Sequence, residues 1–218
     1  MTIDPRILET LEEVRSDGVI LCIRLGADAP VSVVDACLAA ARGGLRVLEI
    51  TLTTPGALDA IRELSKEDVI VGAGTVLSIE DVMRVAAAGG RFVLSPVYDP
   101  GVMDEAHLHS MLALPGASTP TEILAAHRHG AHMVKVFPAG PLGGPAYLRA
   151  IRGPLPDISL VPTSGATAET LHEYLDAGAA AIGVGNEVFP PGFTLESVEK
   201  AARRVREAMD KARSRSDR

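Results

Sequence analysis

The segment VLEITLTTPGALDAIRELSKEDVIVGAGT, residues 47–75, contains one complete repeat of the pattern that decides the fold. Short runs rich in Val and Ile, at 47–51 and 69–72, flank a longer segment rich in Ala, Leu and Glu whose apolar residues follow a helical period. A strand, a polar loop, a helix and a second strand in this order are typical of a βα unit, and successive units of this kind form a parallel sheet.

The same repeat extends in both directions from this segment and occurs eight times. The predicted helices end at glycines such as Gly43-Gly44 and Gly130, where glycine can take the left-handed conformation that terminates a helix. Eight units favour a (β/α)8 (TIM) barrel, and a doubly wound open sheet is the main structural alternative. We predict strands at Val19–Arg24, Val47–Thr51, Val69–Gly72, Phe92–Ser95, Met111–Leu114, His132–Val136, Ile158–Val161 and Ala180–Val184.

Two further helices flank the eight units. Asp4-Pro5 is typical of an N-cap followed by proline at the first helical position, and it opens an extra N-terminal amphipathic helix through Val14 that is a candidate to close the bottom of the barrel. A last helix, over about Leu195–Lys211, is expected to pack outside the barrel. Residues 212–218 lack apolar periodicity, so we expect a frayed tail on a single domain that spans residues 1–218.

The composition excludes several classes of protein. The 218 residues are 47% hydrophobic and 22% charged, which suits one domain with a large apolar core. The net charge of -7 argues against nucleic acid, because binding to a phosphate backbone requires clustered Lys and Arg. No secretory signal opens the chain, and no apolar stretch approaches the roughly 20 residues of a membrane span. We therefore expect a cytoplasmic protein without a membrane partner.

The cysteines and histidines predict no metal site. Cys22 lies in an apolar run and Cys37 lies among alanines, and neither has a neighbouring ligand at metal spacing. We interpret both cysteines as packing residues. The six histidines fall mostly on helices or helix ends and form no ligand cluster in the sequence, so we expect neither a metal nor another cofactor.

Two charged residues interrupt apolar strands: Glu49 in RVLEITL and Lys135 in MVKVF. A charged residue in a strand that is covered on both faces must point into the barrel or be paired. One interpretation is a structural ion pair. The other is catalysis, because a lysine in an apolar barrel mouth loses stability in its charged form and its neutral amine can attack a carbonyl. A nearby carboxylate could then shuttle protons.

Glycine-containing turns follow the seventh and eighth strands, at Pro162–Ala166 and Gly183–Asn186. Barrels often bind phosphate at this place, because free backbone N–H groups and a helix N-terminus favour an anion. The turn Gly72–Thr75, after the third strand, also allows close approach of the backbone to a ligand. These turns together indicate an anion site at the C-terminal ends of the strands.

In this order the motifs resemble the family of 2-keto-3-deoxy-6-phosphogluconate (KDPG) aldolases, also called bifunctional 4-hydroxy-2-oxoglutarate aldolases. The resemblance covers almost the whole chain. It rests on Leu48–Leu52, Gly72–Val76, Ser95-Pro96, Pro115-Gly116, Thr119–Glu122, Lys135–Ala139 and Pro162–Gly165. It implies a homotrimeric, metal-independent class I aldolase that acts on a small 2-keto acid.

The resemblance also implies a role for each site residue. Lys135 would form a Schiff base with pyruvate, and Glu49 would be the acid/base. Arg24 is similar to the family's arginine on the first strand, which faces the site. The pyruvyl portion would be surrounded by Thr75, Pro96 and Phe137. Thr163 would contact the aldehyde portion. The phosphate would be bound by Ser164, Gly165, Gly185 and Asn186.

Three positions depart from the family's pattern. Thr53 stands where many members have Arg, Ser164 replaces the first glycine of a Gly-Gly pair, and Asn186 replaces a common serine. The leading hypothesis is cleavage of KDPG to pyruvate and glyceraldehyde 3-phosphate, and the alternatives within the same chemistry are 4-hydroxy-2-oxoglutarate and the galactonate epimer. In the family, Thr at position 163 accompanies the gluconate epimer and Val the galactonate epimer. The alternative of another class is a non-catalytic phosphosugar-binding barrel.

Overall fold

In the computed structural model, which describes residues 4–216, strands and helices alternate along the chain from Val19 onward, except at 112–117, where two strands follow each other. The strands are β1 Val19–Ile23, β2 Val47–Thr51, β3 Ile70–Gly74, β4 Phe92–Leu94, β5 Leu112–Leu114, β6 Gly116–Ala117, β7 Val134–Val136, β8 Leu160–Pro162 and β9 Ile182–Val184. The helices are α1 Pro5–Asp17, α2 Val33–Arg42, α3 Ala57–Leu64, α4 Ile79–Ala87, α5 Pro100–Leu108, α6 Pro120–Arg128, α7 Gly144–Arg152, α8 Leu171–Asp176 and α9 Leu195–Ser216.

The strands pair in parallel and follow the order of the chain. One sheet has the order β5-β4-β3-β2-β1-β9, and a second has the order β6-β7-β8. β1 pairs with β2 on one side and with β9, the last strand, on the other. A doubly wound sheet changes direction at an internal strand, so this order rules out that alternative.

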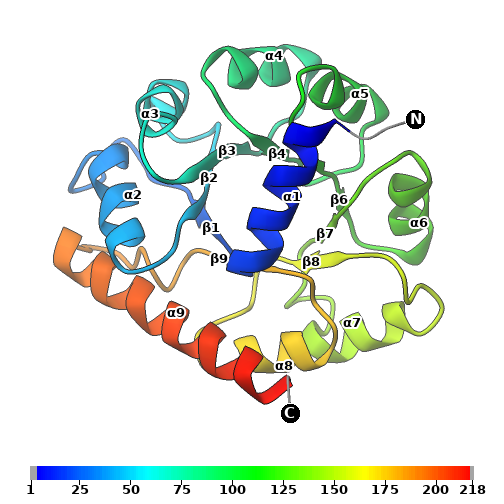
Figure 1. Cartoon of the computed structure of the whole chain (residues 1–218). Helices are drawn as coiled ribbons and strands as arrows, with labels where there is room; N and C mark the ends of the chain where they lie inside the picture. Colours follow the sequence, from blue (N-terminus) through cyan, green and yellow to red (C-terminus); the bar gives the residue numbers. More distant parts are fainter. Residues whose placement is uncertain (1–3, 217–218) are drawn as a thin grey trace.

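Hydrogen bonds join the two sheets at both edges. Between β5 and β6 lies Pro115, which has no N–H to donate but whose C=O accepts from Lys135 N–H at 2.9 Å. At the other edge Thr163 forms a β-bridge with Gly183, and Ala180 N–H donates to Leu160 C=O at 2.9 Å. The parallel sheet therefore curls into a barrel-like ring, which the helices surround (Figure 1).

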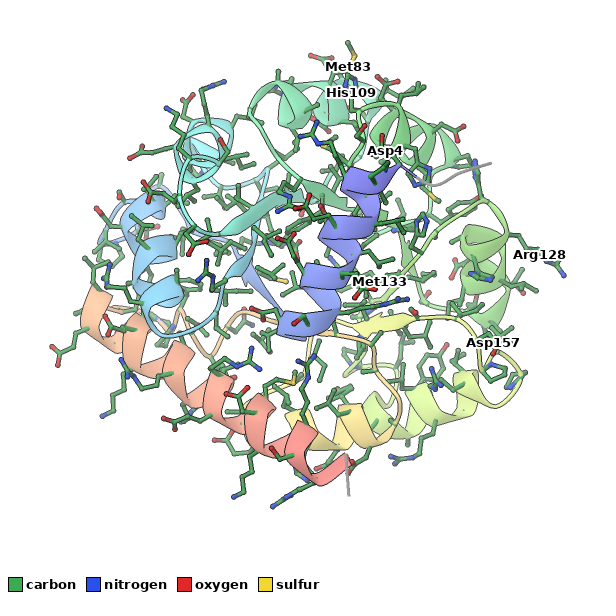
Figure 2. All side chains as sticks on the ribbon, viewed as in Figure 1. Asp4, Met83, His109, Arg128, Met133 and Asp157 are labelled. Carbon is green, nitrogen blue, oxygen red and sulfur yellow. The ribbon has the colours of Figure 1, made fainter. Side chains whose placement is uncertain are left out.

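The inward-facing residues near the start of the strands form one apolar cluster with α1. Every second side chain of a strand points to the same face, so Ile20, Val47 and Met133 point inward. They pack with Leu11 and Val14 of α1, in a cluster separate from the one between the strands and the outer helices. Figure 1 shows α1 crossing the ring of strands, and Figure 2 shows Met133 near the middle of that ring.

Both terminal helices are longer than the sequence indicates. α1 begins as predicted, with the Asp4 side chain accepting from Arg6 N–H at 2.8 Å, but it continues to Asp17. α9 continues to Ser216, so the prediction of a frayed tail from residue 212 is wrong up to that residue, and residues 217–218 lie outside the described part. Arg213 explains the extension, because its guanidinium donates to the C=O groups of Ser16 and Arg15 at the end of α1. Among residues 4–216, no helix has both the length and the apolar character of a membrane span.

Candidate active site

Lys135 and Glu49 meet inside the ring of strands. Lys135 is the middle residue of β7 and Glu49 the middle residue of β2, each two positions beyond an apolar inward-facing residue, Met133 and Val47. Lys135 Nζ lies 3.7 Å from Glu49 Oε1, and the side chains are only 7% and 2% exposed. The structure therefore brings together the two charged residues that interrupt their strands.

Such a buried pair is a weak source of stability. Removing two charges from water costs several kcal/mol per ion, and their mutual attraction offsets this only with good geometry and further hydrogen bonds. The 3.7 Å separation is longer than a hydrogen bond, so the amine is not locked to the carboxylate. The geometry therefore fits a reactive amine with a proton carrier beside it better than it fits a structural ion pair.

The strand next to Glu49 leaves space for its carboxylate. A Cβ on Gly74, at the end of β3, would overlap Glu49 Oε1, so this position requires glycine. The next residue, Thr75, has φ 59°, a left-handed conformation that β-branched residues rarely adopt. Backbone strain of this kind is concentrated at ligand sites. Arg24 follows β1, is exposed, and its Nη2 lies 3.4 Å from Thr75 Oγ1.

The other residues assigned to the pyruvyl portion lie near Lys135. The ring centroid of Phe137, which follows β7, is 5.2 Å from Lys135 Nζ, close enough for a cation–π interaction. Pro96 follows β4, and its backbone is so close to Gly116 that a Cβ on that glycine would overlap it. Gly116 is the partner of Lys135 in the pairing of β6 with β7. Pro96 therefore lies one strand away from the lysine, on the side opposite β8.

The residues assigned to the aldehyde and phosphate portions lie on two adjacent loops. Thr163 is buried and pairs with Gly183, so the loops after β8 and β9 begin next to each other. Ser164 and Gly165 both have positive φ, 75° and 106°, and Ser164 is exposed. Gly185 approaches Cys22 C=O so closely that a Cβ there would lie 2.8 Å from that oxygen, and the next residue, Asn186, is exposed. The loops thus present backbone and side-chain donors together.

Two residues make contacts that the sequence analysis did not predict. Thr53, the residue at which many members of the resembled family have Arg, bonds through its hydroxyl with Thr51 Oγ1 at 3.1 Å. Cys22, interpreted as a packing residue, lies on the inward face of β1 with its Sγ 2.7 Å from Glu49 Oε2. The alternation of side chains along a strand could have predicted this position. Residues 20, 22 and 24 share one face of β1, and both Ile20 and the site residue Arg24 point inward.

A family model described as KDPG and KHG aldolase matches residues 12–202 of this chain. The chain is 37% identical over 171 residues to the 2-dehydro-3-deoxy-phosphogluconate aldolase of Treponema pallidum, covering 78% of this chain and 79% of that protein. The family match includes all the strands from Val19 to Val184 and the site residues from Cys22 to Asn186.

Solved structures give the same picture. A native KDPGal structure superposes with a TM-score of 0.81 at 28% identity, covering 90% of this chain and 95% of the other. The KDPG aldolase of Legionella pneumophila, with pyruvate captured as a covalent carbinolamine intermediate, superposes with a TM-score of 0.78 at 28% identity, covering 90% and 97%.

Proposed function

This chain belongs to the KDPG and KHG aldolase family, and from that premise we propose that Lys135 is its Schiff-base lysine and Glu49 its acid/base. The observation that carries the proposal is the buried amine of Lys135, 3.7 Å from a buried carboxylate on another strand. Family membership makes the enzyme a lyase that cleaves a carbon–carbon bond of a 2-keto acid. KDPG is the substrate that we propose, with pyruvate and glyceraldehyde 3-phosphate as products.

The first half of the reaction joins the substrate to the enzyme. The neutral amine of Lys135 attacks the C2 carbonyl, which gives a carbinolamine. The carbinolamine hydroxyl leaves as water after it takes a proton from Glu49, and a positively charged Schiff base remains. This Schiff base is the electron sink for the next step, so the mechanism requires no metal ion.

The second half breaks the bond between C3 and C4. The ionised carboxylate of Glu49 takes the proton of the C4 hydroxyl, the C3–C4 electron pair moves toward the Schiff base, and glyceraldehyde 3-phosphate leaves. The enamine that remains takes this proton back at C3. Water then hydrolyses the Schiff base to release pyruvate and the neutral amine of Lys135.

The surrounding residues would orient the substrate. We place the pyruvyl portion between Thr75, Pro96 and Phe137, with the guanidinium of Arg24 facing the anionic substrate from the end of β1. The hydroxyl of Thr163 would contact the hydroxyl at C4, which the reaction deprotonates. Support comes from the contacts that connect these residues to the Lys135–Glu49 pair. Phe137 lies beside Lys135 Nζ, Thr75 follows Gly74 next to Glu49 Oε1, and Arg24 Nη2 lies 3.4 Å from Thr75 Oγ1.

The phosphate would bind at the adjacent loops after β8 and β9. Ser164, Gly165, Gly185 and Asn186 offer backbone N–H groups and two polar side chains there. The positive φ of Ser164 and Gly165 turns successive peptide groups, which is how backbone N–H groups come to surround an anion. The bonding of Thr53 with Thr51, in place of an arginine, makes this enzyme more dependent on these loops for anion binding.

We also propose that the ring is a complete (β/α)8 barrel that α1 closes at its N-terminal end, and that residues 1–218 form one domain. The hydrogen bonds at both sheet edges support the first statement. The packing of Leu11 and Val14 against the inward-facing strand residues supports the closure of the barrel by α1.

A homotrimer is the assembly that we propose. Leu77, Ile79, Met83 and Val97 are large apolar residues with about half of their surface exposed, on α4 and on the loops before α4 and after β4. Exposed apolar residues grouped in this way are typical of a protein interface. Met83→Glu should lower the mass measured by sedimentation equilibrium, whereas Leu8→Glu on α1 should not. A monomer mass for the parent would contradict the trimer.

A cleavage assay tests the proposed function. Pyruvate release is followed with lactate dehydrogenase, using KDPG, its galactonate epimer and 4-hydroxy-2-oxoglutarate in turn, with and without a chelator. We expect KDPG to be cleaved with the highest kcat/KM and the chelator to have no effect. A loss of activity that a divalent metal restores would contradict Schiff-base catalysis. Lack of cleavage of all three substrates would favour the non-catalytic phosphosugar-binding barrel.

A further inference from the structure

Cys22 contacts the carboxylate of Glu49 from the neighbouring strand. The two residues are Cα partners in the pairing of β1 with β2. Cys22 Sγ lies 2.7 Å from Glu49 Oε2, so a thiol donates to one oxygen of the carboxylate that we propose as the proton carrier. Apolar packing alone would not require a sulfur atom in this place.

The thiol is held in its donor form. Desolvation raises the pKa of the Cys22 thiol well above its ordinary value, and the negative charge of Glu49 is the second cause of this rise. A protonated thiol can donate one hydrogen bond, whereas a thiolate could only accept. The contact between Cys22 Sγ and Glu49 Oε2 is therefore a hydrogen bond that the thiol donates.

The two oxygens of Glu49 have different surroundings. Oε2 accepts from Cys22, whereas Oε1 lies 3.7 Å from Lys135 Nζ and next to the space that Gly74 leaves open. A carboxylate bonded at one oxygen has a fixed rotation, so its other oxygen faces the amine in one direction. Proton transfer to a reacting group requires such placement within hydrogen-bond reach.

We propose that Cys22 is a positioning residue: its thiol anchors Glu49 Oε2 and thereby aims Glu49 Oε1 at the Lys135 amine and the substrate bound to it. This inference rests on the proposed function, since it acts through Glu49 as the proton carrier. Cys22 itself exchanges no proton with the substrate. Without the thiol, Oε2 loses its hydrogen bond inside a buried site, and the carboxylate turns to find another partner.

Three single variants separate positioning from packing. Cys22→Val keeps the volume close to that of the thiol but removes the donor, and Cys22→Ser keeps a donor. Cys37→Val is the matched control, because Cys37 is the other thiol of the chain and is buried between α2 and the strands, in the apolar layer outside the ring of strands. For each variant, kcat and KM are measured from pH 5 to 9 with KDPG, and Tm is measured separately.

We expect Cys22→Val to lower kcat roughly 3- to 10-fold, the lower range for a hydrogen bond to a charged group because a thiol is a weak donor. KM should not change. The shape of its kcat profile against pH should also change, since the proposed proton carrier loses its hydrogen-bond donor. Cys22→Ser should recover most of the loss, and Cys37→Val should behave like the parent.

Two outcomes overturn the inference while the parent still cleaves KDPG. One is a Cys22→Val enzyme with the kcat and the pH profile of the parent. The other is an equal loss in Cys22→Val and Cys22→Ser, with an unchanged pH profile and a lowered Tm, which would mean that Cys22 only packs. A parent that cleaves no 2-keto acid would instead overturn the proposed function, and the role of Cys22 together with it.

Discussion

The two ends of the ring of strands are built from the same strands but have opposite chemistry. On β2, Val47 faces the N-terminal end and Glu49 the C-terminal end, and on β7 the corresponding residues are Met133 and Lys135. Each pair is separated by two positions, so both members point inward. A distance of two residues along one strand therefore separates the apolar core that packs against α1 from the reactive side chains.

This arrangement predicts that stability and catalysis depend on different ends. Burial of an apolar side chain stabilises a protein by about 1.5–3 kcal/mol, whereas a buried ion pair adds little or can even destabilise. Changes near α1 should therefore act on unfolding, and changes at the C-terminal ends of the strands should act on turnover. Four variants, each with a measurement of stability or of turnover, test this separation.

Glu49→Gln should have the largest effect on catalysis. The amide cannot carry the proton, so kcat with KDPG should fall by roughly 10²- to 10⁴-fold, the contribution of a positioned acid/base. Val47→Ala, two residues earlier on β2, is the control and should lower Tm without lowering kcat. An active Glu49→Gln enzyme would mean that another group carries the proton.

Leu11→Ala should have the largest effect on stability. Leu11 is buried between α1 and the inward-facing strand residues, so the cavity should lower the free energy of unfolding by about 2–5 kcal/mol, measured by urea denaturation. Leu108→Ala is the matched control, because Leu108 is 79% exposed and should change stability by less than about 0.5 kcal/mol. A large loss of kcat in Leu11→Ala at temperatures where it stays folded would couple the two ends.

Thr163→Val should change the choice between epimers. The substitution keeps the shape and removes the hydroxyl, so the preference for the gluconate over the galactonate epimer, measured as a ratio of kcat/KM, should shrink by about 1–2 kcal/mol. Thr10→Val makes the same change on α1, where the hydroxyl donates to Arg6 C=O, and should leave the ratio unaltered. Equal use of both epimers by the parent and by Thr163→Val would show that another group sets the choice.

The pH dependence of stability should give the smallest effect. His107 of α5 and His132, just before β7, have lowered pKa values, mainly because burial disfavours the charged imidazolium. Below about pH 6.5 the unfolded chain therefore takes up protons more readily than the folded chain, and stability falls with pH. His107→Phe, which keeps a ring beside His132, should lose less stability than the parent between pH 7 and pH 5. The same fall in both proteins would contradict this origin.

The sequence predicts the repeating parts of this molecule well. All eight predicted strands are present, and glycines that were predicted to end helices, including Gly44 and Gly130, have positive φ. These features depend on local chemistry and on one side-chain period. Glu49 and Lys135 could be found because a charge interrupts an otherwise apolar strand.

The sequence does not predict features that depend on contacts between distant segments. The end of α9 is a basic run without periodicity, and its helical structure is accompanied by the burial of Ala212 and by hydrogen bonds from Arg213 to the C=O groups of Ser16 and Arg15. The two-residue strand β6 is too short for any periodic pattern. Cys22 lies in an apolar run of the sequence, which indicates only packing. Its proposed role depends on the position of Glu49 on the neighbouring strand.

The proposal that Lys135 forms the Schiff base is tested by reduction with borohydride in the presence of pyruvate, followed by peptide mass spectrometry. Lys66, Lys200 and Lys211 are exposed, whereas Lys135 is 5% exposed, so the adduct identifies the reactive amine. We expect one reduced pyruvyl group on Lys135 in the parent and in Lys66→Ala. Lys135→Ala should show neither adduct nor turnover. An adduct on another lysine, or a parent that cleaves KDPG without forming any adduct, would contradict it.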